Sequence, residues 1–133
     1  WRHGGVAFGR TGEENFTKKL SKTSKRVAIR QALSLQNADK RILTIKDFKI
    51  TDGRTKEAVK NLEAAKADLN SKILLVLPEK DELTLRATNN LNNVKVVRPT
   101  YLNVFDILNA DQIIFTEKAL EGLENWVLGK EEA

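Results

Sequence analysis

The chain has 133 residues, of which 41% are hydrophobic and 31% are charged, a composition typical of one soluble globular domain. It contains no cysteine and a single histidine, which excludes disulfides, thiolate metal sites and histidine-rich metal sites. No apolar run approaches the roughly 20 residues of a membrane-spanning helix, and no signal-peptide pattern opens the sequence, so we expect no membrane partner.

The positive charge is concentrated in the first quarter of the chain. Residues 1–30 hold eight basic and two acidic side chains, whereas the other 103 residues hold 15 basic and 16 acidic ones. The whole net charge of +5 therefore arises at one end of the sequence. Such an asymmetry indicates a polyanionic partner, although a solvated basic helix face would give the same pattern.

Residues 1–20 show neither a helical nor a strand period and contain four glycines. We predict an extended arm that a partner orders, because such a segment buries too little surface to offset its loss of conformational entropy. Its arginines and lysines can neutralise phosphates, and its glycines allow a nucleic-acid strand to approach closely. Trp1 and Phe8 are candidates for stacking on unpaired bases, whereas Phe16 could equally pack against the protein's own core.

Ser21 or Thr23 can cap a helix that runs to about Asn37. The basic residues of this helix recur at spacings of three and four, so they share one broad side. The opposite side, predicted to face the core, carries Val27, Ala28, Ala32 and Leu35. Ile29 and Leu33 fall inside the basic arc, where a second contact, to protein or RNA, would explain them.

From residue 41 onward, short apolar runs alternate with helical stripes. Strands are predicted at 42–45, 73–77, 94–97 and 113–115, and helices around 58–65, 83–91, 104–108 and 117–127. Asn103 and Thr116 are predicted to cap the last two helices, and the alternation of Leu83 and Leu85 also fits a strand. The pattern predicts an α/β fold for residues 21–133, a three-layer α/β/α domain with a mainly parallel sheet of about four strands.

No complete catalytic motif is present. The sequence matches neither the phosphate-binding glycine loop, nor the dinucleotide fingerprint, nor the nucleophile elbow. Glu79, Asp81 and Glu82 follow a predicted strand, where α/β enzymes hold their sites, but an acidic first helical turn explains this cluster equally well. We expect no enzyme activity, cofactor, metal or small-molecule substrate, and a small nucleotide-binding enzyme is only an alternative.

The first nine residues, Trp1-Arg2-His3-Gly4-Gly5-Val6-Ala7-Phe8-Gly9, resemble the W-R-G-G-G-x-x-F-G segment of the bacterial-type large-subunit ribosomal protein L-four family. Similarity continues through residues 18–20, 26–34, 74–78, 102–108 and 116–120, so the resemblance covers essentially the whole chain. The first stretch and residues 102–108 are the specific ones. His3 stands where the family often has glycine.

The resemblance implies a structural constituent of the large ribosomal subunit that binds 23S-type ribosomal RNA and neighbouring ribosomal proteins and acts early in assembly. It implies a cytoplasmic ribosome of bacterial or organellar type. A long loop of this family lines the polypeptide exit tunnel, and residues 1–16 would be its returning arm. The family's first strand, first helix and loop tip would lie upstream of Trp1, so we expect a fragment. Some members repress their own operon, which leaves a messenger-RNA-binding regulator as an alternative.

The basic first quarter therefore contains every candidate binding residue. An RNA-binding arm is predicted at residues 1–20, followed by the basic side of the first helix. The predicted RNA-binding residues are Trp1, Arg2, His3, Gly4, Gly5, Phe8, Arg10, Lys18, Lys19, Lys22, Lys25, Arg26 and Arg30.

Overall fold

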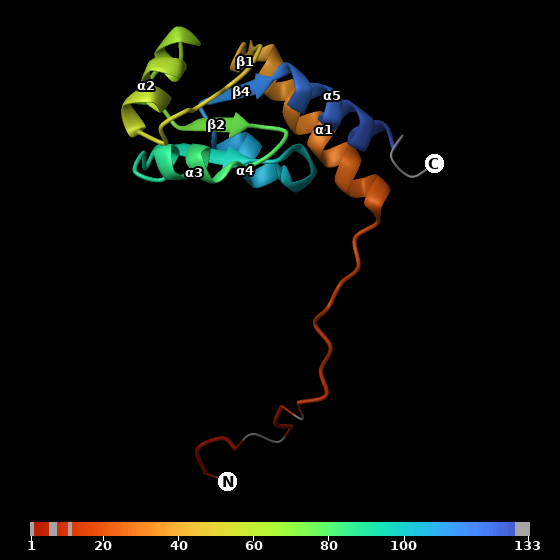
Figure 1. Ribbon diagram of the computed structural model, residues 1–133. Helices are drawn as coiled ribbons and strands as arrows, with labels where there is room; N and C mark the ends of the chain where they lie inside the picture. Colours follow the sequence, from red (N-terminus) through yellow and green to blue (C-terminus); the bar gives the residue numbers. More distant parts are fainter. Residues whose placement is uncertain (1, 6–7, 11, 130–133) are drawn as a thin grey trace.

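The computed structural model describes residues 2–5, 8–10 and 12–129, and its central element is a parallel four-stranded sheet. The strands are β1 (Ile42–Ile45), β2 (Ile73–Val76), β3 (Val94–Val97) and β4 (Gln112–Thr116). Their order is β1-β4-β2-β3, so the last strand lies between the first two (Figure 1). Each strand lies within one residue of its predicted bounds, because each is a short segment in which apolar residues predominate.

Helices cover both faces of this sheet. The helices are α1 (Lys22–Ala38), α2 (Thr55–Ala64), α3 (Glu82–Thr88), α4 (Val104–Asn109) and α5 (Glu117–Leu128). Side chains alternate along β2: Leu74 and Val76 pack with α1, α4 and α5, whereas Ile73 and Leu75 pack with α2 and α3. The predicted three-layer α/β/α fold is therefore confirmed.

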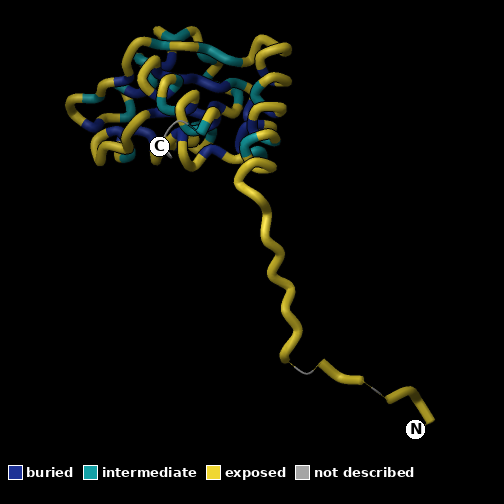
Figure 2. The backbone as a smooth tube through the Cα atoms, turned by 90° about the vertical axis from the view of Figure 1, so that its right-hand side faces the viewer, coloured by how far each residue is buried: buried dark blue, intermediate teal, exposed yellow. Residues whose placement is uncertain are grey.

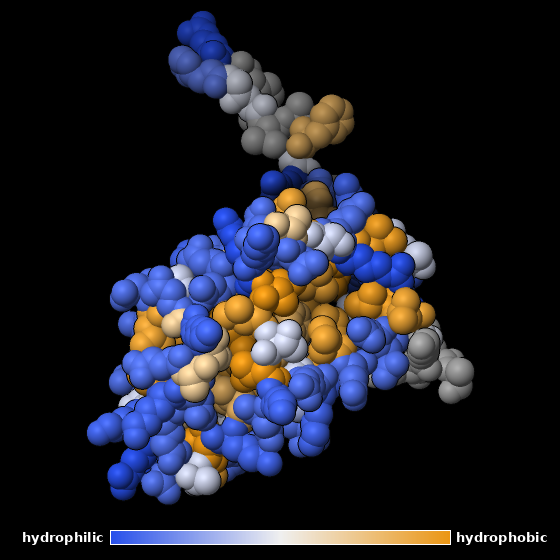
Figure 3. Space-filling view, turned by 90° about the horizontal axis from the view of Figure 1, so that it is seen from above, coloured by the Kyte–Doolittle hydropathy of each residue, from blue (hydrophilic) through white to orange (hydrophobic). Residues whose placement is uncertain are grey.

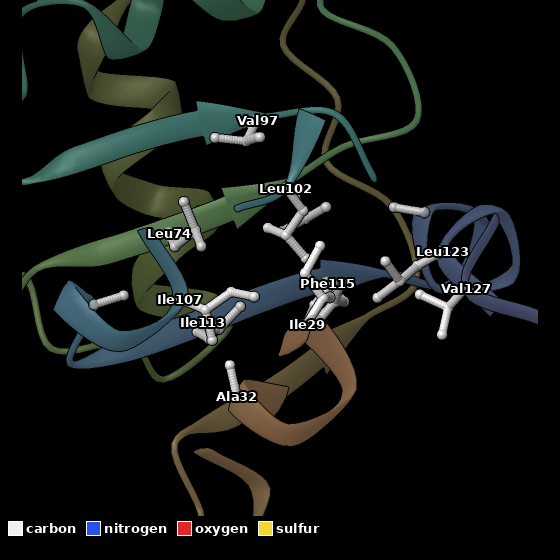
Figure 4. Packing of buried hydrophobic residues seen from close by; sticks show 13 residues of the cluster. Ile29, Ala32, Leu74, Val97, Leu102, Ile107, Ile113, Phe115, Leu123 and Val127 are labelled. Atoms are coloured by element: carbon white, nitrogen blue, oxygen red, sulfur yellow. The ribbon is translucent and has the colours of Figure 1, made fainter. Parts of the chain in front are cut away.

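The larger core cluster fixes α1, which carries part of the predicted binding surface. Figure 4 shows this cluster, with Phe115 of β4 and Leu74 of β2 on the sheet. Ile29, Ile107 and Leu123 reach it from α1, α4 and α5. Burying each such side chain stabilises the fold by about 1.5–3 kcal/mol relative to leaving it exposed.

The face of α1 that packs on the core differs in part from the predicted one, since Ala32 is buried as predicted and Ala28 is half-buried. Ile29 is only 4% exposed and Leu33 is half-buried, whereas Val27 and Leu35 are 41% and 56% exposed, so their predicted core position was wrong. At 3.6 residues per turn, the buried stripe continues the basic stripe toward the helix's C-terminal end. The basic residues occupy the first turns, which extend beyond the sheet in Figure 1, and the apolar residues occupy the later turns.

Two of the predicted helix caps are confirmed with their side-chain hydrogen bonds, and the third is confirmed in position only. The Ser21 hydroxyl accepts a hydrogen bond from Ser24 N at 3.1 Å, and Asn103 Oδ1 accepts one from Asp106 N at 2.7 Å. Thr116 occupies the N-cap position of α5, but its side chain makes no cap hydrogen bond. Thr116 also ends β4 and is buried, so its hydroxyl donates to Val76 O of the neighbouring strand at 3.5 Å.

The described residues before α1 lie outside the globular body. Residues 2–5, 8–10 and 12–20 contain no helix or strand and are exposed throughout. In Figures 1 and 2 they extend away from the globular body as an irregular segment of chain. That residues 1–20 act as a separate RNA-binding arm stays a prediction.

Candidate nucleic-acid interface

The predicted RNA-binding residues fall into an extended part and a helical part. Trp1 lies outside the described residues. The extended part is exposed and consists of Arg2, His3, Gly4, Gly5, Phe8, Arg10, Lys18 and Lys19. The helical part lies in the first three turns of α1 and consists of Lys22, Lys25, Arg26 and Arg30. All the described members except the half-buried Arg26 are exposed, so the surface they form is open to a ligand.

The two phenylalanines before α1 do not pack in the core. Phe8 is 96% exposed and Phe16 is 77% exposed, so neither packs against the globular body. Their rings are therefore available for stacking on bases. Gly4 has a φ of +74°, a conformation that side chains with a β-carbon rarely adopt, so glycine is required there for backbone geometry.

Two arginines of the helical part hold the end of α5. Arg30 Nη2 donates a hydrogen bond to Val127 O at 2.6 Å. A β-carbon built on Gly129 would lie 3.0 Å from Arg26 Nη1, so this guanidinium lies against the residue that ends α5. The last turn of α5 has no basic residue of its own. Arg26 and Arg30 therefore bring positive charge to the negative end of that helix dipole.

Replacing Arg30 with alanine should lower the free energy of unfolding by about 1–2 kcal/mol, because a hydrogen bond from a charged group to a carbonyl is lost. Urea denaturation followed by circular dichroism measures this. Lys25→Ala is the matched control on the same helix, since Lys25 is exposed and its loss should stay within roughly 0.5 kcal/mol. Equal effects of the two substitutions would show that Arg30 does not anchor α5.

The sequence did not reveal a hollow that opens beside the first turns of α1. Its volume is about 480 Å³. Its lining comes from Leu20 before α1, from α1, from α5 and from the segment after β3, which contains the 3-10 helix η1 (Pro99–Tyr101). Tyr101 and Trp126 are its aromatic residues. No sequence signal placed them near the basic helix, because only the packing of η1 and α5 around α1 brings them there.

Only part of the acidic cluster after β2 gathers at one cavity. Glu79 and Asp81 line a cavity of about 320 Å³ at the carboxyl ends of the strands, but Glu82 does not. In the same cavity, a hydrogen bond from Lys49 lowers the pKa of Asp47, which makes that carboxylate a weaker base. Among the residues that the structure describes, no group of three or more His, Cys, Asp or Glu side chains could hold a metal. The arrangement favours neither acid–base nor metal-assisted chemistry.

A second, mainly apolar hollow lies at the β1 edge of the sheet, between α1, β1 and α5. Figure 3 views the molecule from above, where β1 lies in Figure 1, and shows apolar side chains gathered in the middle of this face. The hollow measures about 390 Å³ and includes Leu33, Ile42 and Leu120 in its lining. Within the described part of the chain, its lining contains no charged side chain, so it offers a phosphate no ion pair. The candidate interface is therefore confined to the arm and the first turns of α1.

Within the described ranges, no helix combines the length and the apolar character that crossing a membrane requires.

Comparison with known proteins gives one consistent family. Residues 1–126 match the model of the Ribosomal protein L4/L1 family. The chain is 34% identical over 124 residues to the large ribosomal subunit protein uL4 of Spiroplasma kunkelii, covering 93% of this chain and 59% of that protein. It is 36% identical to uL4 of Mycoplasma mycoides subsp. mycoides over the same length, and 39% identical to uL4 of Oceanobacillus iheyensis over 121 residues, 91% of this chain and 57% of that protein. The chain thus spans less than two thirds of the length of these relatives.

Proposed function

The chain belongs to the Ribosomal protein L4/L1 family, and from this membership we propose that it binds RNA as a structural constituent of the large ribosomal subunit. Its partners would be 23S-type ribosomal RNA and neighbouring large-subunit proteins, in a cytoplasmic ribosome. As a primary RNA-binding protein it would act early in subunit assembly. The observation that carries the proposal is the exposed basic surface that runs from the arm onto α1.

The charge of this surface supports a phosphate backbone as the ligand. Eight basic residues lie in the first 30 positions against two acidic ones. Lys18, Lys19 and Lys25 are exposed and can approach phosphates without disturbing the core. Such contacts position RNA without reading its sequence, so base contacts have to supply specificity. The exposed rings of Phe8 and Phe16 are suited to bases that are unpaired.

We propose a structural function and not a catalytic one. The cavity at the carboxyl ends of the strands has an ion-paired carboxylate and no histidine in its lining. For the whole protein, the extended loop would contribute to the polypeptide exit tunnel, with residues 1–20 as its returning arm. A regulator that binds messenger RNA would use the same basic surface, and no separate observation favours it.

The salt dependence of RNA binding tests the proposal. With six to ten phosphate contacts, the affinity for a 23S-type RNA fragment should fall by roughly 10³-fold or more between about 50 and 200 mM salt. Fluorescence anisotropy with a labelled fragment, repeated across salt concentrations, gives the slope of log affinity against log salt. Weak binding with little dependence on salt would contradict an RNA-binding function for this surface.

A further inference from the structure

We propose that the hollow beside α1 takes an unpaired nucleobase of the bound RNA, stacked on Tyr101. This inference rests on the proposed function and adds a base-binding site on the globular body. The hollow's volume of about 480 Å³ falls in the range of roughly 300–1,000 Å³ that is typical of small-molecule sites. A single base with its ribose is therefore a suitable occupant in size.

The position of the hollow makes it continuous with the basic surface. Leu20, the last residue of the arm sequence, lies in its lining together with Ser24 and Lys25 of α1. Among the residues that the structure describes, no acidic side chain lines it, and Lys25 supplies an ammonium group. A strand of RNA whose phosphates contact Lys18, Lys19 and Lys25 would therefore pass directly over the opening. This charge pattern favours RNA over an acidic or neutral protein segment.

Tyr101 presents an exposed aromatic ring from a well-anchored turn. Its backbone N–H donates to Arg98 O at 3.1 Å, which fixes the turn of η1. On either side the chain is anchored, because Pro99 is buried and Leu102 is only 4% exposed. Tyr101 itself is 71% exposed, so a fixed backbone presents an aromatic ring that the core does not use. Because the backbone is already fixed, stacking a base on this ring has to order only the side-chain torsions of Tyr101.

The floor of the hollow is apolar and its polar groups are mostly engaged. Val104 and the half-buried Trp126 contribute apolar surface on which a base can lie. The side-chain amide of Asn103 is engaged by Asp106 at both ends: Oδ1 accepts from Asp106 N at 2.7 Å and Nδ2 donates to Asp106 Oδ2 at 3.1 Å. Ser24 Oγ lies 2.7 Å from Ser21 Oγ. The site is therefore suited to stacking with little discrimination between bases.

The experiment compares an oligouridine with a blunt RNA duplex as probes for the complete chain. Tyr101→Ala should weaken binding of oligouridine by about 5- to 100-fold and leave duplex binding unchanged, because only the single strand offers a base for stacking. Tyr101→Phe keeps the ring and should retain the affinity. Phe105→Ala is the matched control, since Phe105 is 73% exposed but lies outside the hollow's lining.

Circular dichroism of each variant shows that the fold is native before affinities are compared. An oligouridine affinity that Tyr101→Ala leaves intact, or an equal loss for both probes, overturns the base site. If Tyr101→Ala loses binding to a neighbouring ribosomal protein and keeps its oligouridine affinity, the hollow binds a protein and the base site is overturned. If the wild-type chain binds neither RNA probe, the proposed function itself fails, which is a distinct result.

Discussion

Replacing Lys18, Lys19 and Lys25 together with glutamate should weaken binding of ribosomal RNA by roughly 10²–10³-fold at about 0.1 M salt, because three phosphate contacts are lost. The slope of log affinity against log salt should also become shallower by about 0.7–0.9 for each contact. All three side chains are exposed, so the free energy of unfolding should change by no more than roughly 0.5 kcal/mol per residue. Fluorescence anisotropy and urea denaturation measure the two quantities.

A second triple variant separates local contacts from net charge. Lys56 and Lys60 on α2 and Lys80 after β2 are also exposed, and changing them to glutamate alters the net charge by the same amount. α2 covers the opposite face of the sheet from α1, so this variant should keep most of its RNA affinity. If the two triple variants lose affinity equally, binding follows overall charge and the interface assigned to the arm and α1 is wrong.

Ile29→Ala should lower the free energy of unfolding by about 2–5 kcal/mol, because a large side chain is removed from a packed core. Ile29 is 4% exposed and belongs to the cluster that joins α1 to the sheet. Leu35→Ala is the matched control on the same helix. Leu35 is 56% exposed, so its truncation should cost no more than roughly 0.5 kcal/mol. Urea denaturation of the two variants and the wild type gives both values.

The pair of substitutions also decides which face of α1 is buried. The face predicted from the sequence would make Leu35 the costly position and Ile29 the neutral one. A larger loss for Leu35→Ala than for Ile29→Ala would mean that α1 is rotated about its axis. Its basic residues would then point away from α5, in conflict with the bond from Arg30 to Val127.

The layers of this fold were predictable from the sequence because strands buried on both faces are marked by unbroken apolar runs. Residues 73–77 are such a run, and the alternation of runs with helical stripes was sufficient to predict a parallel sheet. The segment 83–91 was ambiguous, and it folds as α3 with Thr84, Ala87 and Thr88 buried at helical spacing.

The buried face of α1 could not be predicted from periodicity alone. Lys25 and Ile29 differ by four positions and therefore share one stripe, although one is exposed and the other buried. Their different environments follow from how far α1 extends past the sheet, which is a property of the assembled domain. For the same reason Tyr101 was not identified as a candidate site residue: its distance from Lys25 in sequence is large, and the hollow joins them only after folding.

If Arg30 binds phosphate as predicted, its hydrogen bond to Val127 O couples RNA binding thermodynamically to the end of α5. A guanidinium has five N–H donors, so Arg30 can hold the carbonyl of Val127 and a phosphate oxygen at the same time. RNA that binds in this mode would suppress fraying of the last turn of α5, and a firmer α5 terminus would in return raise the affinity for RNA. Amide exchange near residue 127 would then report occupancy of a site that lies 97 residues earlier in the chain.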